Sequence, residues 1–320
     1  MTGRPRRPGW PGRPRRPSPP DRLPRSVPTA ATEGRGLAPA ADPDAVSVHL
    51  RRPALGPGEP VRALLLHGLG DSATVWEPFA RHAPGRLELW CAELPWGGGG
   101  RWSRDEDSGR WVDDALRLAT DAAGARPDLL IAHSFAATLA LARLAAGAEL
   151  AGAVVLVAPF YRASADEFDW PAISYYLNEF HQILAEGIRV RAGARLSDDL
   201  RTDMAVRVRD RLGPYGWSRF FDAYLRTPGL PLAGIDVPLL LVAGERDTAA
   251  FPRDTRALRD ALAPTHPRVE AHVLPGLGHL PMVERPEQFS RLVDGFTASA
   301  LAGPQQHARR RLHQHSRAAS

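Results

Sequence analysis

Short apolar runs alternate with helical patterns through the middle of the chain. Continuous apolar runs bounded by Gly, Pro or Asp are typical of parallel strands buried on both faces. The runs are Ala63–Leu66, Leu87–Leu94, Leu129–Ala132, Ala153–Val157, Leu239–Ala243 and Val269–Leu274. The helical patterns cover Asp113–Ala123, Ala136–Ala146, Thr255–Ala263 and Glu287–Ala300. This alternation predicts an α/β fold with a mostly parallel, doubly wound sheet and helices on both faces.

One interval departs from this rhythm. Residues 160–232 separate two predicted strands by about 70 residues, and the interval is rich in aromatic side chains with a mostly helical pattern. We interpret it as a helical cap inserted over one edge of the sheet. The alternative is a set of ordinary core helices in a longer domain.

The two ends of the chain differ in composition from its middle. The chain carries a net charge of +5, of which residues 1–41 hold +7 and residues 303–320 hold +4, so residues 42–302 carry about −6. Segments this rich in Arg, Pro and Gly cannot bury enough apolar surface to fold, so we expect two disordered basic tails around one domain at 42–302. Such tails raise the hypothesis of nucleic-acid tethering, which predicts strongly salt-dependent binding. We do not expect a nucleic-acid partner, because the basic ends hold almost no aromatic residues.

Other sequence features restrict the class of protein further. No run approaches the roughly 18 apolar residues of a membrane span, so we expect no membrane partner. The N-terminal arginines are not followed by the apolar segment of a secretory signal, and we expect a cytoplasmic protein. The single cysteine, Cys91, lies in an apolar run and is expected to pack in the core.

Ser134 stands where a predicted strand runs directly into a predicted helix. Ala132 and Ala136 lie two residues to either side. A sharp turn that presents a nucleophilic serine needs small residues at these positions, because strand and helix come close together there. The usual residues are glycines, so the alanines are a departure that still leaves room for the turn. The alternative is a serine that only caps the helix N-terminus.

A second strand ends at His67-Gly68-Leu69-Gly70. Backbone N–H groups in such a loop can stabilise a developing oxyanion. Leu69 is the candidate for one donor, and Phe135, which follows Ser134 at a helix N-terminus, is the candidate for the other. Four further residues near these loops are candidate substrate contacts: Gly68, Gly70, His133 and Phe160.

Two later strands end near an acid and a histidine. Asp247 follows the strand at 239–243, with Glu245 as a competing carboxylate. The alternative for Asp247 is a solvated loop charge beside Arg246. His279 lies in a glycine-rich loop after the strand at 269–274, where small neighbours give the ring room to approach a hydroxyl.

The chain order of these residues resembles that of the α/β-hydrolase superfamily. In a parallel sheet the carboxyl ends of the strands share one edge, so the loop at 67–70, Ser134, Asp247 and His279 can meet. The resemblance covers residues 45–300, includes the stretch 283–287 after the histidine, and places the interval 160–232 where that family carries its cap. It implies Ser134 as nucleophile, His279 as base and Asp247 as the group that orients the base.

The resemblance further implies a serine hydrolase that acts on an ester-type bond of a small molecule without a cofactor. A thioester, a lactone or an activated C–C bond would use the same three residues, and so remain alternatives. We expect no metal site, because no grouping of metal-ligating residues has the required spacing. The aromatic interval favours an apolar or aromatic substrate, or else serves to pack the cap. A hypothesis of another class is a non-catalytic small-molecule-binding protein of this fold.

Overall fold

A computed structural model describes residues 46–96 and 107–302. The predicted basic tails at 1–41 and 303–320, the proposed domain start at 42, and the glycine run at 97–100 lie outside the described residues.

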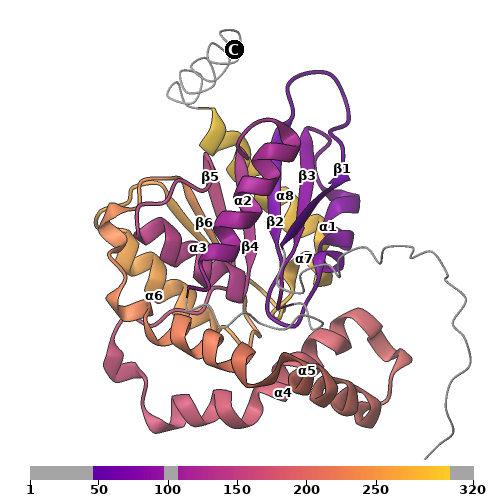
Figure 1. The fold of residues 1–320 in the computed structure, drawn as a ribbon, viewed down its shortest axis with the longest axis vertical. Coiled ribbons are helices and arrows are strands. Elements are labelled where there is room, and N and C mark those ends of the chain that lie inside the picture. The colour runs from indigo at the N-terminus through magenta and orange to yellow at the C-terminus, as the bar shows by residue number, and fades with distance from the viewer. Residues whose placement is uncertain (1–45, 97–106, 303–320) are drawn as a thin grey trace, which may run out of the picture. The chain divides into compact units, whose positions relative to one another are not determined.

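The described strands form a single sheet in the order β1-β3-β2-β4-β5-β6-β7 (Figure 1). β1 pairs antiparallel with β3, and the other neighbours pair in parallel. The strands are β1 (Ser47–Arg52), β2 (Val61–Leu66), β3 (Leu87–Glu93), β4 (Leu129–His133), β5 (Ala153–Val157), β6 (Leu239–Gly244) and β7 (Val269–Leu274). All six predicted strands are present. β1 was not predicted because it is mostly exposed and has no apolar run.

Helices cover both faces of the sheet, so the predicted fold class is confirmed. The side chains of Leu64 and Leu66 face the layer of α2, α3 and α6, while Leu65 faces the layer of α1, α7 and α8 (Figure 1). The helices of these two layers are α1 (Glu77–His82), α2 (Arg110–Ala123), α3 (Phe135–Ala145), α6 (Pro252–Leu262), α7 (Pro281–Glu284) and α8 (Pro286–Leu301). Short 3-10 turns lie at Ala73–Trp76, Ala165–Glu167, Gly193–Arg195, Thr227–Gly229 and Leu232–Gly234.

Cys91 lies fully buried in β3, on the face covered by α1 and α8. Burial raises the pKa of its thiol to about 12, so the side chain is uncharged and packs as a small apolar residue. No helix in the described ranges is long and apolar enough to span a membrane.

Two long helices lie between β5 and β6, and we call them the cap helices: α4 (Trp170–Ala192) and α5 (Asp198–Leu225). Their starts are fixed by capping side chains, since Asp169 accepts the N–H of Ala172 and Ser197 accepts the N–H of Leu200. α5 is kinked at Gly213, whose φ of 63° falls in the left-handed region that favours glycine.

Aromatic side chains join the cap helices to the sheet. Phe160, just after β5, contacts the rings of Tyr176, Phe220 and Tyr224 at centroid distances of 4.7 to 6.0 Å. Edge-to-face pairs of this kind add to the free energy gained by burying the rings. Much of the aromatic content of this interval therefore serves packing, although Phe160, Phe180 and Phe220 also line the pocket described below.

Candidate active site

Ser134 forms the sharp turn between β4 and α3. Its backbone has φ 56° and ψ −121°, a conformation that is strained for a residue with a side chain. Ala132 and Ala136 are completely buried on either side of the turn. Ser134 occupies the helix N-cap position, but its hydroxyl makes no capping hydrogen bond. The hydroxyl is instead directed at His279.

The structure brings Ser134, His279 and Asp247 together in one line of hydrogen bonds. Nε2 of His279 lies 2.9 Å from Oγ of Ser134, and Nδ1 lies 2.8 Å from Oδ2 of Asp247. The second oxygen of Asp247 accepts the N–H groups of Ala249 and Ala250 at 2.8 and 3.1 Å. Glu245, the competing carboxylate, is exposed and accepts the N–H of Gly276 instead. The arrangement leaves Nε2 of His279 able to accept the hydroxyl proton of Ser134.

The charge of His279 is controlled by its neighbours. Burial alone would lower the pKa of the imidazole, but the charge of Asp247 and its hydrogen bond outweigh burial and raise the pKa above 6.5. Asp71 and Glu284 act in the same direction. The site therefore favours the imidazolium that forms when His279 takes a proton.

Glu284, at the end of α7, holds the loop that carries His279. Its carboxylate accepts the N–H of Gly278 at 2.9 Å and the N–H of Leu280 at 3.1 Å, on either side of the histidine. Glu284 lies in the stretch 283–287 that belongs to the family resemblance, but this role was not predicted for it. Only the fold of the loop shows that both N–H groups point at one carboxylate.

The N–H groups of Leu69 and Phe135 are available to a ligand, since neither has a hydrogen-bond partner among the described residues. The loop of Leu69 is held by His67, whose Nε2 accepts the N–H of Leu94 at 3.0 Å. Nδ1 of His67 therefore carries the proton and donates to the carbonyl of Gly68 at 2.9 Å. Burial lowers the pKa of His67, which keeps the ring neutral in this role.

A cavity of about 480 Å³ opens onto Ser134 and His279. Of the predicted substrate contacts, Gly70, His133 and Phe160 line it. Gly68 packs against the neighbouring side chains instead: a Cβ added there would lie 2.9 Å from both Nδ1 of His133 and Cβ of Ser134. The remaining wall was not predicted and includes Asp71 and Leu280. Most of it comes from the cap helices: Phe180, Ile183, Leu184, Gly187, Ile188 and Arg191 of α4, with Met204, Arg207, Val208, Arg211 and Phe220 of α5.

His133 is a neutral histidine beside the candidate base. Its Nε2 lies 2.9 Å from the carbonyl oxygen of His279 and donates to it. Burial, with the nearby charge of His279, holds its pKa well below the ordinary value. His133 thus supports the backbone of His279 without competing for its proton.

The cap helices also hold the loop that follows Asp247. The hydroxyl of Tyr175 donates to the carbonyl of Thr248 at 2.7 Å, and that of Tyr176 donates to the carbonyl of Ala249 at 2.8 Å. Ala249 is also a donor to Asp247. The acid is thus connected through one residue to α4. No local sequence pattern indicates this contact, because it joins residues 73 positions apart.

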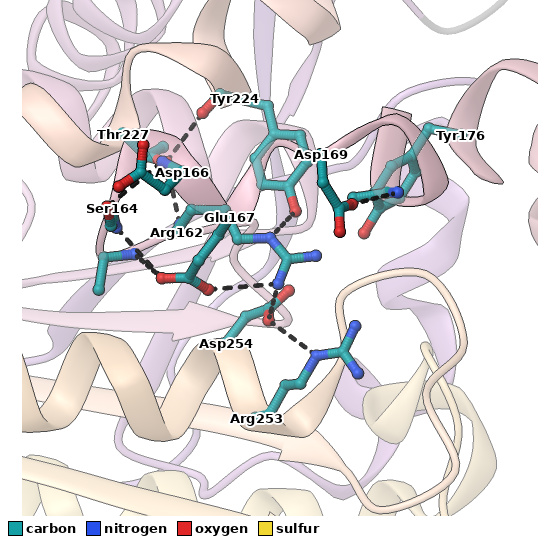
Figure 2. A network of polar contacts seen from close by, with 12 residues as sticks. Arg162, Ser164, Asp166, Glu167, Asp169, Tyr176, Tyr224, Thr227, Arg253 and Asp254 are labelled. Atoms are coloured by element: carbon teal, nitrogen blue, oxygen red, sulfur yellow. Dashed lines mark hydrogen bonds and ion pairs between the residues drawn. The ribbon is translucent and has the colours of Figure 1, made fainter. Parts of the chain in front are cut away.

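A buried ionic network lies next to this loop (Figure 2). Arg162 donates to the hydroxyl of Tyr224 at 2.8 Å and lies 3.4 Å from the carboxylate of Asp254, at the start of α6. The same guanidinium nitrogen that faces Asp254 also lies 3.5 Å from the carboxylate of Glu167. Burial raises the pKa of Asp254 to about 6 although Arg162 lowers it. The network joins the segment after β5 to α5 and α6.

Within the described ranges, no group of three or more His, Cys, Asp or Glu side chains is arranged to hold a metal ion.

Comparisons with known proteins bear on the family and the fold of this chain. Residues 63–292 match the model of the alpha/beta hydrolase family. Lipase LipV of Mycobacterium tuberculosis is 28% identical over 118 residues, which is 36% of this chain and 42% of that protein. The alignment thus spans less than half of the length of this relative.

Two solved structures share the fold. A bacterial membrane phospholipase A superposes with a TM-score of 0.59 at 20% identity, over 82% of this chain and 88% of that one. A putative lipase from Acinetobacter baumannii superposes with a TM-score of 0.57 at 18% identity, over 80% and 88% of the two chains. The family model matches well over half of the chain, and this protein belongs to the alpha/beta hydrolase family.

Proposed function

We propose that the protein is a serine hydrolase that cleaves an ester-type bond of a small substrate through an acyl-enzyme. The observation that carries the proposal is the continuous line of hydrogen bonds from Ser134 through His279 to Asp247, at 2.9 and 2.8 Å. The cavity opens directly onto the serine hydroxyl. The likeness to proteins named lipase and phospholipase supports an ester as the substrate.

In the first half-reaction, Oγ of Ser134 attacks the carbonyl carbon while its proton passes to Nε2 of His279. The imidazolium is stabilised by Asp247, which also fixes the ring so that Nε2 faces the serine. His279 then gives the proton to the leaving alcohol. Water, deprotonated by the same nitrogen, releases the acid from Ser134 and restores the hydroxyl.

The negative charge that develops on the carbonyl oxygen would be bound by the N–H groups of Leu69 and Phe135. Phe135 is the first residue of α3, so its N–H also benefits from the positive end of the helix dipole. Each donor of this kind typically contributes on the order of 3 kcal/mol to stabilising the transition state.

The test uses p-nitrophenyl esters of increasing acyl length, assayed with the wild-type protein and with Ser134→Ala. We expect the wild type to hydrolyse these esters. In Ser134→Ala the turnover should be lower by several orders of magnitude, up to about 10⁶-fold. Ser218→Ala is the matched control, because Ser218 is exposed on α5 and bonds only within its own helix. Its activity should equal that of the wild type.

A fluorophosphonate probe separates an enzyme from a binding protein of the same fold. An activated Ser134 should be labelled, and labelling should be lost in His279→Ala. If Ser134→Ala kept more than a few per cent of the esterase activity, the assignment of the nucleophile would be wrong. Absence of both labelling and turnover in the folded wild-type protein would favour the binding protein.

A further inference from the structure

Arginine side chains gather at one end of the pocket. Arg191 of α4 lines it together with Arg207 and Arg211 of α5. The other end is aromatic, with Phe180 and Phe220. Arg191 follows Phe180 by eleven residues, which corresponds to about 16 Å along α4. The pocket thus has two ends of different chemistry.

The positive charge of Arg191 is balanced by the carboxylate of Asp71. Arg191 donates to the carboxylate of Asp71 at 2.6 Å, and Asp71 is only 6% exposed. Asp71 is also the one carboxylate among the described residues that line the pocket. The pocket wall therefore keeps two positive charges, those of Arg207 and Arg211, without an internal counter-charge.

Arg207 and Arg211 have no ion pair or hydrogen bond of their side chains within the described residues. This sets them apart from other arginines of the cap helices, which pair with a nearby carboxylate. These pairs are Arg189 with Glu186, Arg201 with Asp198, Arg209 with Asp210 and Arg226 with Asp222. These four arginines are thus each paired with an acid, whereas Arg207 and Arg211 have no such pair among the residues that the structure describes.

The spacing of the two residues suits a shared ligand. Side chains four residues apart lie on the same side of a helix, and two like charges there repel each other. An anion between them removes the repulsion, and a guanidinium matches the paired oxygens of a carboxylate or phosphate. Two unpaired positive charges also run against the net charge of the surrounding domain, because residues 42–302 carry about −6.

We propose that Arg207 and Arg211 bind an anionic group of the substrate, a carboxylate or a phosphate. The substrate is then an ester that places an apolar segment against Phe180 and Phe220 and an acidic group at the arginine end. This inference rests on the proposed hydrolase function and narrows the substrate from a neutral apolar ester to an amphiphilic one.

The test compares three p-nitrophenyl esters of similar chain length: the neutral valerate, the hydrogen glutarate and the 4-phosphonobutyrate. We expect the wild type to prefer at least one anionic ester over the valerate by tenfold or more in kcat/KM. Preference for the glutarate identifies a carboxylate, and preference for the phosphonate identifies a phosphate. Arg207→Gln/Arg211→Gln should abolish the preference, because kcat/KM for the anionic ester falls to the level of that for the valerate.

The matched control is Arg209→Gln/Arg226→Gln, which removes the same charge from α5 and its C-terminal cap, outside the pocket. It should retain the preference. The inference is overturned if the wild type does not prefer either anionic ester, or if the preference survives in Arg207→Gln/Arg211→Gln.

A binding measurement separates this inference from the proposed function. Ser134→Ala is titrated calorimetrically with phenyl valerate and phenyl hydrogen glutarate, and with phenyl 4-phosphonobutyrate. Tighter binding of an anionic ester, lost when Arg207 and Arg211 are also replaced, supports the anion site even if no ester is turned over. Turnover of valerate without any anion preference refutes the anion site and leaves the hydrolase intact.

Discussion

Gly244, the last residue of β6, has no space for a side chain. A Cβ at this position would lie 2.1 Å from the carbonyl oxygen of Gly278 and 2.4 Å from that of Leu277. Both atoms belong to the backbone of the loop that carries His279, so they cannot turn aside as a flexible side chain would. Gly244→Ala must therefore push this loop away from the end of β6.

The size of the displacement follows from the contact distances. Ordinary contact of a Cβ begins at 3.4 Å, so the carbonyl of Gly278 must retreat by about 1.3 Å. His279 is the next residue, and its hydrogen bond to Asp247 is only 2.8 Å long. A shift of this size would stretch that bond beyond the range of a hydrogen bond. We expect kcat to fall by about 10²-fold, because misplacing a catalytic group by 1 Å has an effect of that order.

The same clash lowers stability. Overpacking of this kind typically costs 1–3 kcal/mol, which corresponds to a fall of several degrees in Tm for a domain of this size. The assay combines ester turnover with thermal melts followed by circular dichroism. Gly234→Ala is the control, since nothing lies within 4 Å of a Cβ there. Its activity and Tm should match those of the wild type.

A milder variant keeps the test informative if Gly244→Ala does not fold. A Cβ at Gly278 would meet only side-chain atoms, of Glu284 at 3.3 Å and of Glu186 at 3.6 Å, and side chains can give way. Gly278→Ala should therefore lose less activity than Gly244→Ala. If Gly244→Ala kept the Tm and kcat of the wild type, the close packing of β6 against this loop would not be what positions His279.

Three further outcomes follow from the site. The plot of kcat/KM against pH should rise with a midpoint above 6.5, because His279 acts as a neutral base and Asp247 raises its pKa. A midpoint below 6.5, or a midpoint that did not fall in Asp247→Asn, would contradict the raised pKa of His279. Glu284→Ala should lower kcat about 10- to 100-fold by releasing the N–H groups beside His279, whereas Glu287→Ala, at an exposed side chain, should not. Asp254 has a pKa of about 6 in the folded protein and 3.8 in the unfolded protein, so the folded state binds more protons between these pH values. The contribution of Asp254 to the free energy of unfolding therefore falls as the pH rises from 3.8 to 6. The free energy of unfolding of Asp254→Asn, measured by urea denaturation, should therefore rise by about 2 kcal/mol relative to that of the wild type between pH 4.5 and pH 7. A difference between the two proteins that did not change with pH would refute the raised pKa of Asp254.

The sheet and the residues at its carboxyl edge could be predicted from the sequence because both depend on local patterns. Buried parallel strands read as apolar runs, and Ser134, Asp247 and His279 each follow such a run within a few residues. β1 and the six-residue α1 escaped prediction because one is mostly exposed and the other is short. The alternative in which Ser134 only caps a helix could not be dismissed from the sequence, because strand-to-helix turns and caps share the same residue types.

The groups that position the triad could not be predicted, because they come from distant segments. Tyr176 reaches the loop of Asp247 across 73 residues, and Arg191 reaches Asp71 across 120. Nothing in the local sequence pattern around Tyr176 or Arg191 distinguishes these residues from their neighbours. The same holds for Arg207 and Arg211, whose lack of carboxylate partners among the described residues becomes visible only beside the pairs of Arg201 and Arg209.

The loop from Asp247 to Ala250 therefore has two roles that constrain each other. On one side, Asp247 orients His279, and its own orientation depends on the N–H groups of Ala249 and Ala250. On the other side, the carbonyls of Thr248 and Ala249 accept hydrogen bonds from α4. Because α4 also lines the pocket, the pocket wall is joined to the loop whose carboxylate holds His279. If the proposed function is correct, the shape of the pocket and the geometry of Ser134, His279 and Asp247 are coupled through one short segment of backbone, although they belong to parts of the chain that are far apart in sequence.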